Sequence, residues 1–106
     1  LARQFADAFK RRFGKQPEPF AVQAYDATAI GIKAIEDLIR QGRSPSRDQV
    51  TAAIRQLRYQ GITGPIEFNA KGDNKTSLYF VLRVASSNPS RWGDNREVKR
   101  LTLTAP

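Results

Sequence analysis

Apolar residues repeat at helical spacing from the start of the chain. They recur every four positions, at Leu1, Phe5, Phe9 and Phe13. This spacing predicts an amphipathic helix over residues 1–13 with an aromatic stripe on one face, and Gly14 is a natural end for it. No capping residue precedes the helix, because Leu1 already belongs to the repeat. We therefore expect the chain to be the end portion of a larger protein.

A stretch with two prolines separates this helix from a second one. Because the residue before a proline is pushed out of the helical region, Gln16 and Glu18 should be extended, which makes residues 15–20 a stiff crossing. Periodicity resumes from Ala21 to Gln41, and Gly42 ends the pattern. The predicted apolar face of this second helix consists of Val22, Tyr25, Ala29, Ile32, Ile35 and Ile39.

Small side chains make the first half of the second helix smooth. They are Ala24, Ala27, Ala29 and Gly31. Another backbone can approach such a surface closely, so we expect the helix to pack against a sheet. The charged residues Glu36 and Asp37 lie one turn from Lys33 and Arg40, which predicts ion pairs on a solvated face.

A third helix begins at a recognisable cap. Ser46 and Gln49 have the spacing of a capping box, and an apolar stripe follows that should run to about Tyr59. The glycines and the proline after it break the pattern. The stripe consists of Val50, Ala53, Ile54 and Leu57.

Two strands complete the predicted elements. Alternation at residues 66–68 indicates a short strand that Pro65 can only begin. Residues 78–84 are almost continuously apolar, which is typical of a strand buried on both faces by layers from elsewhere. Residues 86–106 read as a loosely held basic tail. Its anchors are Trp92, Val98, Leu101 and Leu103.

The charge balance raises a nucleic-acid hypothesis. The 106 residues include 18 Lys and Arg against 10 Asp and Glu, a net charge of +8. In that hypothesis Lys10, Arg11 and Arg12 hold phosphates while an aromatic side chain stacks on bases. However, the phenylalanines of residues 1–13 share one helical face and the basic triplet lies largely on another, as in an ordinary core-facing helix. A basic nucleic-acid-binding module is therefore the alternative, and no nucleic-acid partner is expected.

The residue types give little catalytic chemistry. The chain has no Cys and no His, which removes thiolate nucleophiles, Cys/His zinc sites and imidazole acid–base catalysis. Asp26 stands inside an apolar stretch, where a hydrogen bond across an interface or an interaction with the helix dipole is favoured over ligand contact. Lys71 and Gly72 lack the context of a phosphate loop, so Gly72 is expected in a turn with positive φ. We expect no enzyme, no cofactor and no metal.

Several short motifs resemble one known family when they are taken in order. Over residues 1–85 the chain resembles the C-terminal portion of type I periplasmic solute-binding proteins, in particular the branched-chain amino acid binding group of ABC transporters and related receptor ligand-binding regions. Asn69 departs from the family, which commonly has an acidic residue there, and residues 86–106 extend beyond its usual ending. The motifs are Phe5-Ala6-Asp7-Ala8-Phe9-Lys10, Phe13-Gly14, Pro17 to Phe20, Tyr25-Asp26-Ala27, Gly61, Gly64, Phe68, Gly72-Asp73 and Tyr79-Phe80-Val81.

The resemblance implies a partial α/β fold, with three helices followed by two C-terminal strands. Two lobes would close on a small solute, with residues 1–14 in the second lobe, 15–20 crossing the hinge, 21–60 on the first lobe, and the strands within 64–84. Phe20 would line the ligand pocket, with Ala21 and Gln23 as weaker ligand contacts, although Phe20 also suits a hydrophobic staple or a hinge plug. The implied hinge supports are Pro17, Pro19, Tyr25 and Asp26.

The implied function is capture of a small solute, such as an amino acid or a related polar molecule, outside the cytoplasm for uptake through an ABC permease. A ligand-sensing receptor domain with the same fold is the alternative. The family residues that grip an amino acid's charged groups would precede Leu1, so we expect this segment not to hold an amino acid unaided. We also expect the isolated segment to self-associate or swap through the smooth side of its second helix and the edge of strand 78–84.

Overall fold

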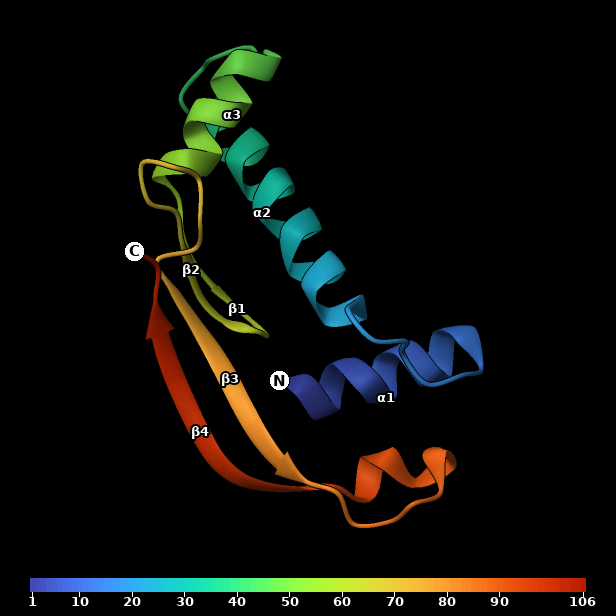
Figure 1. The fold of residues 1–106 in the computed structure, drawn as a ribbon. Coiled ribbons are helices and arrows are strands. Elements are labelled where there is room, and N and C mark those ends of the chain that lie inside the picture. The colour runs from blue at the N-terminus through green and yellow to red at the C-terminus, as the bar shows by residue number, and fades with distance from the viewer.

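Figure 1 shows the computed structural model, which describes residues 1–106 except for the side chain of Trp92. Three helices are followed by strands in two-stranded sheets, a mixed α/β arrangement that confirms the predicted fold class. The helices are α1 (Ala2–Phe13), α2 (Ala21–Arg40) and α3 (Arg47–Gln56). The strands are β1 (Arg58–Gly61), β2 (Gly64–Glu67), β3 (Thr76–Arg83) and β4 (Arg96–Thr104), with a 3₁₀ segment, η1 (Pro89–Asp94), between the last two.

Two predicted helix boundaries, the end of α1 and the start of α3, are confirmed by their capping geometry. Gly14 adopts a left-handed conformation with φ of 71° and its N–H donates to the Lys10 carbonyl. At the start of α3 the Ser46 hydroxyl accepts from the Gln49 N–H, and the Gln49 side chain accepts from the Ser46 N–H, a complete capping box. The sequence therefore sets these boundaries locally.

The end of α3 was predicted too late. The helix stops at Gln56, and Leu57 is already extended with φ of −70° and ψ of 140°. Residues 58–61 form β1, which pairs antiparallel with β2 so that Tyr59 lies opposite Ile66. Leu57 continues the helical spacing, which extended the predicted helix, but backbone pairing with β2 decides the conformation here.

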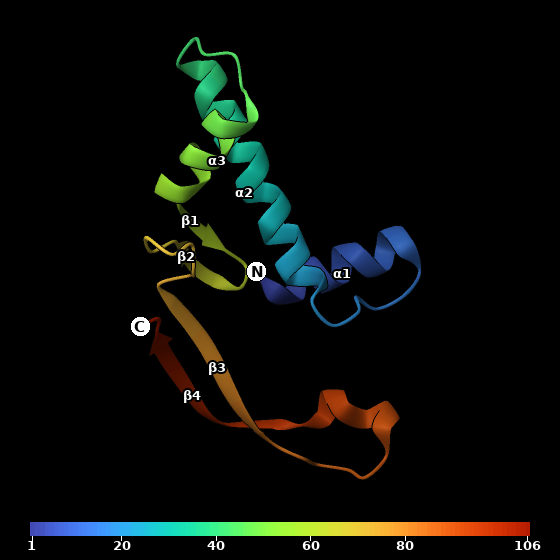
Figure 2. The ribbon, with the colours of Figure 1, turned by 45° about the horizontal axis from the view of Figure 1, so that its top comes forward.

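The tail prediction was also wrong, because residues 96–104 form β4 along the whole of β3. The pairing runs from Thr76 opposite Thr104 to Arg83 opposite Arg96, with a β-bulge at the Val81–Leu82 step. Figures 1 and 2 both show this ribbon extending away from α2 and α3, with η1 at its far end. The tail anchor at Trp92 lies outside the described side chains.

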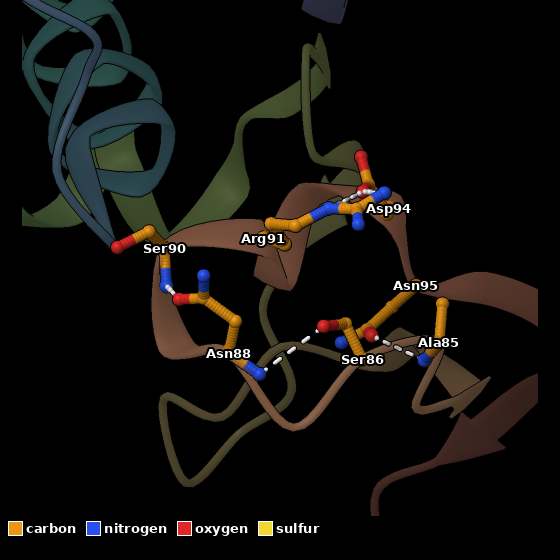
Figure 3. Close-up of polar contacts among 7 residues, drawn as sticks. All are labelled: Ala85, Ser86, Asn88, Ser90, Arg91, Asp94 and Asn95. Atoms are coloured by element: carbon orange, nitrogen blue, oxygen red, sulfur yellow. Dashed lines mark hydrogen bonds and ion pairs between the residues drawn. The ribbon is translucent and has the colours of Figure 1, made fainter.

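The connection from β3 to β4 is organised by side-chain hydrogen bonds to the backbone (Figure 3). The side-chain oxygen Oδ1 of Asn95 accepts from the Ala85 N–H at 3.1 Å, which closes the base of the connection. Within it, Asn88 accepts from the Ser90 N–H at 3.0 Å, and the Arg91 guanidinium pairs with Asp94 at 2.7 Å. These local bonds hold the connection in a conformation that reverses the chain direction, so that β4 can pair with β3.

The face of α2 that packs differs from the predicted one. The structure buries Ile30, Ala34 and Leu38 together with Asp26, on the side that faces α3 and the β1–β2 hairpin. The predicted apolar face lies on the other side of the helix and is largely exposed. Its exposed members are Tyr25, Ile32, Ile35 and Ile39.

The exposed stripe of α2 has a regular spacing. With Ala21 and Thr28 included, its positions are separated alternately by four and three residues along the helix. This is the spacing of a narrow seam that receives a second helix. β3 is similar in exposure, because the residues from Leu78 to Leu82 are between 36% and 54% exposed. The covering layers predicted for that strand are therefore not supplied by the described part of the chain.

The molecule is extended for its size. Its radius of gyration is 17.1 Å, against about 13 Å for a compact domain of this length. Its accessible surface is 8505 Å², against about 5,900 Å² for a compact monomer of this mass. The excess area is comparable with a large protein–protein interface.

Candidate functional site

The joint between α1 and α2 places an aromatic ring in solvent. Phe20 is the N-cap residue of α2, and its backbone is left-handed with φ of 68° and ψ of 0°. It is the one non-glycine residue with positive φ in the described chain, and it is 77% exposed. A bulky side chain in this conformation costs about 1–2 kcal/mol, and no packing of the ring offsets that cost. Within the described chain, the ring is therefore not packed as a hydrophobic staple on α2.

An aromatic groove lies between α1 and α2, on one side of this joint. Phe5 contacts Tyr25 edge-on at 5.4 Å between ring centroids, and Phe9 lies 4.6 Å from Phe13. The groove has a volume of about 420 Å³, and Ala21 lines it. Its walls are almost wholly apolar, with the Arg12 side chain among its lining residues.

Gln23 lies on the opposite side of α2 from Ala21, because two residues turn a helix by about 200°. It lines two crevices of about 340 and 350 Å³ beside the β1–β2 hairpin. The structure therefore does not bring the three predicted ligand contacts into one cavity. Ala21 faces the aromatic groove, Gln23 faces the hairpin, and Phe20 projects from the corner between them.

Asp26 joins α2 to the turn between β1 and β2. The carboxylate is 1% exposed and accepts from the Ile62 N–H at 3.0 Å, the Thr63 N–H at 2.8 Å and the Thr63 hydroxyl at 2.6 Å. Of the two favoured explanations, the structure shows the hydrogen bond across an interface. Gly61 is required beside it, since a Cβ there would lie 2.5 Å from Asp26 Oδ2.

The ionisation of Asp26 is set by two opposing effects. Burial is the larger single effect and raises the pKa, because it disfavours the charged carboxylate. The hydrogen bonds from the Thr63 hydroxyl, the Thr63 N–H and the Ile62 N–H together outweigh burial, so the pKa of Asp26 lies below its ordinary value. The carboxylate stays charged at neutral pH, and its oxygens accept hydrogen bonds from the β1–β2 turn.

The remaining predicted hinge supports lie around the joint. Pro17 is partly buried and Pro19 is exposed within the connection from α1 to α2. Tyr25 contacts Phe5 across the two helices, as described above, and is 53% exposed. These positions place Pro17, Pro19 and Tyr25 at the joint, whereas Asp26 faces the hairpin.

Other sequence expectations about charged groups and turns are confirmed. Lys33 pairs with Asp37 and Arg40 with Glu36 on α2. Gly72 has φ of 95° in a turn where the Asn69 side chain accepts from the Lys71 and Asp73 N–H groups, each at 3.0 Å. The side-chain amide oxygen of Asn69 therefore closes this turn.

The sequence did not predict which residues line a crevice together with Gln23. One of its crevices is lined by hydroxyl and amide side chains that lie 40 to 79 residues further along the chain. The only local signal is the Thr63 turn between Gly61 and Gly64. Within the described side chains, no group of three or more acidic residues is placed to hold a metal ion. Among the described helices, none has the length and apolarity needed to cross a membrane.

Comparison with known proteins identifies the family. No curated protein matches the chain. A family model described as periplasmic binding protein matches residues 1–89, which extends from the start of α1 to the first residue of η1. Since this match covers most of the 106 residues, the chain belongs to the periplasmic binding protein family.

Proposed function

We propose that this chain forms one wall and one hinge crossing of an extracytoplasmic protein that captures a small polar solute, such as an amino acid, by lobe closure. The family gives it an extracytoplasmic solute-binding role in general. In the proposal, α1 (within residues 1–14) belongs to one lobe and residues 21–60 to the other, with residues 15–20 crossing between them. The strands of residues 64–84 complete the hinge side, and residues 86–106 are an addition.

The observation that carries the proposal is the strained and exposed Phe20. A left-handed phenylalanine lowers stability and gains nothing by exposing its ring to water. Retaining it therefore suggests a role that the folded chain alone does not use. An aromatic ring at a lobe junction can close over a bound solute, with Ala21 and Gln23 on either side of the same helix end.

The packing of α1 supports movement at this joint. No described residue of α1 is buried, and its aromatic contact with α2 is the Phe5–Tyr25 pair. Both ends of the connection, Gly14 and Phe20, have positive φ. Little buried surface is therefore lost when α1 changes its angle to α2, which suits a hinge formed by a few residues.

The exposed apolar stripe of α2 supports the proposal that other proteins bind this chain. In the proposal, the complete solute-binding protein delivers its ligand to an ABC permease. For the chain in isolation, we propose that a second copy covers the stripe of α2, whose alternating spacing suits a helix of the same kind.

The test is solute binding by the protein that carries this sequence. Isothermal titration against a panel of amino acids and related polar molecules should find a ligand, and Phe20→Ala should weaken it by about tenfold or more. Tyr79→Ala is the matched control, because Tyr79 is also an exposed aromatic but lies on β3. A folded Phe20→Ala protein that binds as tightly as the parent would contradict the role of Phe20. Absence of binding to every panel member would contradict the solute class.

A further inference from the structure

We propose that the chain carries a second binding site, for an uncharged ligand with several hydroxyl groups, such as a polyol. The site is the crevice of about 340 Å³ where α2, the β1–β2 turn and the paired ends of β3 and β4 meet. This volume falls within the range of small-molecule pockets. Its polar lining consists of Gln23, Thr63, Asn74, Thr76, Ser77 and Thr102.

The lining offers hydrogen-bonding groups that the chain itself does not use. Thr63 donates its hydroxyl proton to Asp26, which leaves the oxygen free to accept. Asn74 accepts from the Glu67 N–H through Oδ1, and its amide nitrogen makes no hydrogen bond within the described chain. The side chains of the other four polar lining residues also make no hydrogen bond to described residues, so both donors and acceptors are available in the crevice.

The lining contains no charged side chain. The nearest acid, Asp26, lines the neighbouring crevice and is held by the turn. Lys75 pairs with Glu67 and does not line the crevice. A charged solute would lose hydration here without gaining a counter-ion, whereas hydroxyl groups can exchange water for Thr, Ser and amide partners. Pro65 and Leu78 complete the wall with apolar surface suited to C–H groups.

Two of the polar side chains are held by hydrogen bonds before any ligand arrives, and strand pairing holds the backbone of three others. Asp26 fixes Thr63, and the Glu67 N–H fixes Asn74. Thr76 and Ser77 lie on β3 opposite Thr104 and Leu103, and the Ala105 N–H donates to the Lys75 carbonyl at 2.9 Å, which secures the strand ends. Preorganisation of this kind lowers the entropy lost on binding.

The site depends on a segment outside the family match. Thr102 belongs to β4, whereas the family model ends at residue 89. The site therefore goes beyond the solute role proposed above, and every residue that lines it belongs to this chain. The two proposals can fail separately, because one depends on Phe20 and the other on Thr102.

The experiment is a two-dimensional ¹H–¹⁵N NMR titration of the whole chain with sorbitol and with inositol at millimolar concentrations. Low concentrations matter, because molar polyols stabilise most proteins by exclusion from their surfaces. We expect saturable shifts at the amides of Thr63, Asn74 and Ser77. Thr102→Val should weaken binding by about tenfold, since it removes one hydroxyl with little change of shape.

Thr104→Val is the matched control, because Thr104 lies on the same strand and does not line the crevice. It should bind the polyols as the parent does, and Ser77→Ala should reproduce the loss seen with Thr102→Val. Shifts that rise linearly over the whole chain, or equal effects of the two threonine variants, would show a water-filled crevice and overturn the proposal. Equal binding of gluconate would overturn the uncharged class.

Discussion

Asp26 on α2 and Thr63 in the β1–β2 turn form a buried polar link between a helix and a sheet. The Thr63 N–H and hydroxyl donate to the same carboxylate oxygen at 2.8 and 2.6 Å, while Ile62 serves the other oxygen. The apolar core beside this link consists of Ile30, Ala34 and Leu38. The hairpin is therefore attached to α2 through a buried, hydrogen-bonded carboxylate that lies beside this apolar core.

Removing the carboxylate should destabilise the chain. Asp26→Ala leaves the Ile62 and Thr63 N–H groups without acceptors, and we expect the free energy of unfolding to fall by about 2–4 kcal/mol. Urea unfolding followed by circular dichroism measures this change. The control is Asp7→Asn, an exposed acid of α1, which should change stability little. Equal stability of the Asp26 and Asp7 variants would mean that the link does not hold the hairpin.

The hydrogen bonds of Asp26 also predict that the stability of the chain depends on pH. The pKa of Asp26 is lower in the folded chain than its ordinary value of 3.8, so the unfolded chain takes up a proton first as the pH falls. The stability that Asp26 contributes should be complete above pH 3.8 and lost as the pH falls through the lower pKa of the folded state. Unfolding midpoints measured between neutral and acid pH should show this loss, and Asp26→Asn should flatten it. An unchanged slope in that variant would assign the acid sensitivity to other carboxylates.

Gly61 should tolerate no side chain. A methyl group at this position would meet Asp26 Oδ2 at 2.5 Å, so Gly61→Ala should cost about 1–3 kcal/mol of stability. Gly31→Ala is the control, because no atom lies within 4 Å of its Cβ position and the residue is inside α2. That control should gain about 0.5–1 kcal/mol from helix propensity. Thermal unfolding of both variants gives the comparison, and loss of stability in both would argue against a specific contact with Asp26.

Two substitutions of Phe20 should affect the stability of the chain differently while affecting its solute affinity in the same way. Phe20→Gly relieves the left-handed backbone and should raise stability by about 0.5–1 kcal/mol, whereas Phe20→Ala keeps a Cβ and should not. Both variants lose the aromatic ring, so both should lose solute affinity in the titration described above. Calorimetry measures the two quantities on the same samples. A Gly variant that is less stable than the Ala variant would show that the φ of 68° is not strained.

The exposed stripe of α2 should drive self-association of the isolated chain. Light scattering should detect dimers that dissociate on dilution, and the double variant Ile32→Gln and Ile39→Gln should shift the equilibrium to monomer. Val84→Gln is the control, because Val84 is 71% exposed but lies just beyond β3. A parent chain that stays monomeric at high concentration would refute the second copy as the cover of this stripe.

Elements whose signals are local could be predicted from the sequence. The aromatic repeat, Gly14 and the Ser46–Gln49 box each act over three or four residues, and the structure places α1 and the start of α3 accordingly. The prediction failed where pairing between distant segments decides the conformation. Leu57 continues the helical spacing and extended the predicted helix to about Tyr59, which instead pairs opposite Ile66. Residues 96–104 contain too few apolar residues for a local pattern to predict a strand, and the strand forms by pairing with β3.

The candidate site shows the same division. Local features were enough to predict that Phe20 stands at the start of α2, because two prolines precede it and a helical period resumes after it. Tertiary packing turns Ala21 and Gln23 toward different cavities and engages Asp26 with the β1–β2 turn. It also brings Thr102 into the lining of the same crevice as Gln23. Hydrogen bonds and cavities join residues that are far apart in the chain, and the direction of each side chain depends on packing that no local pattern contains.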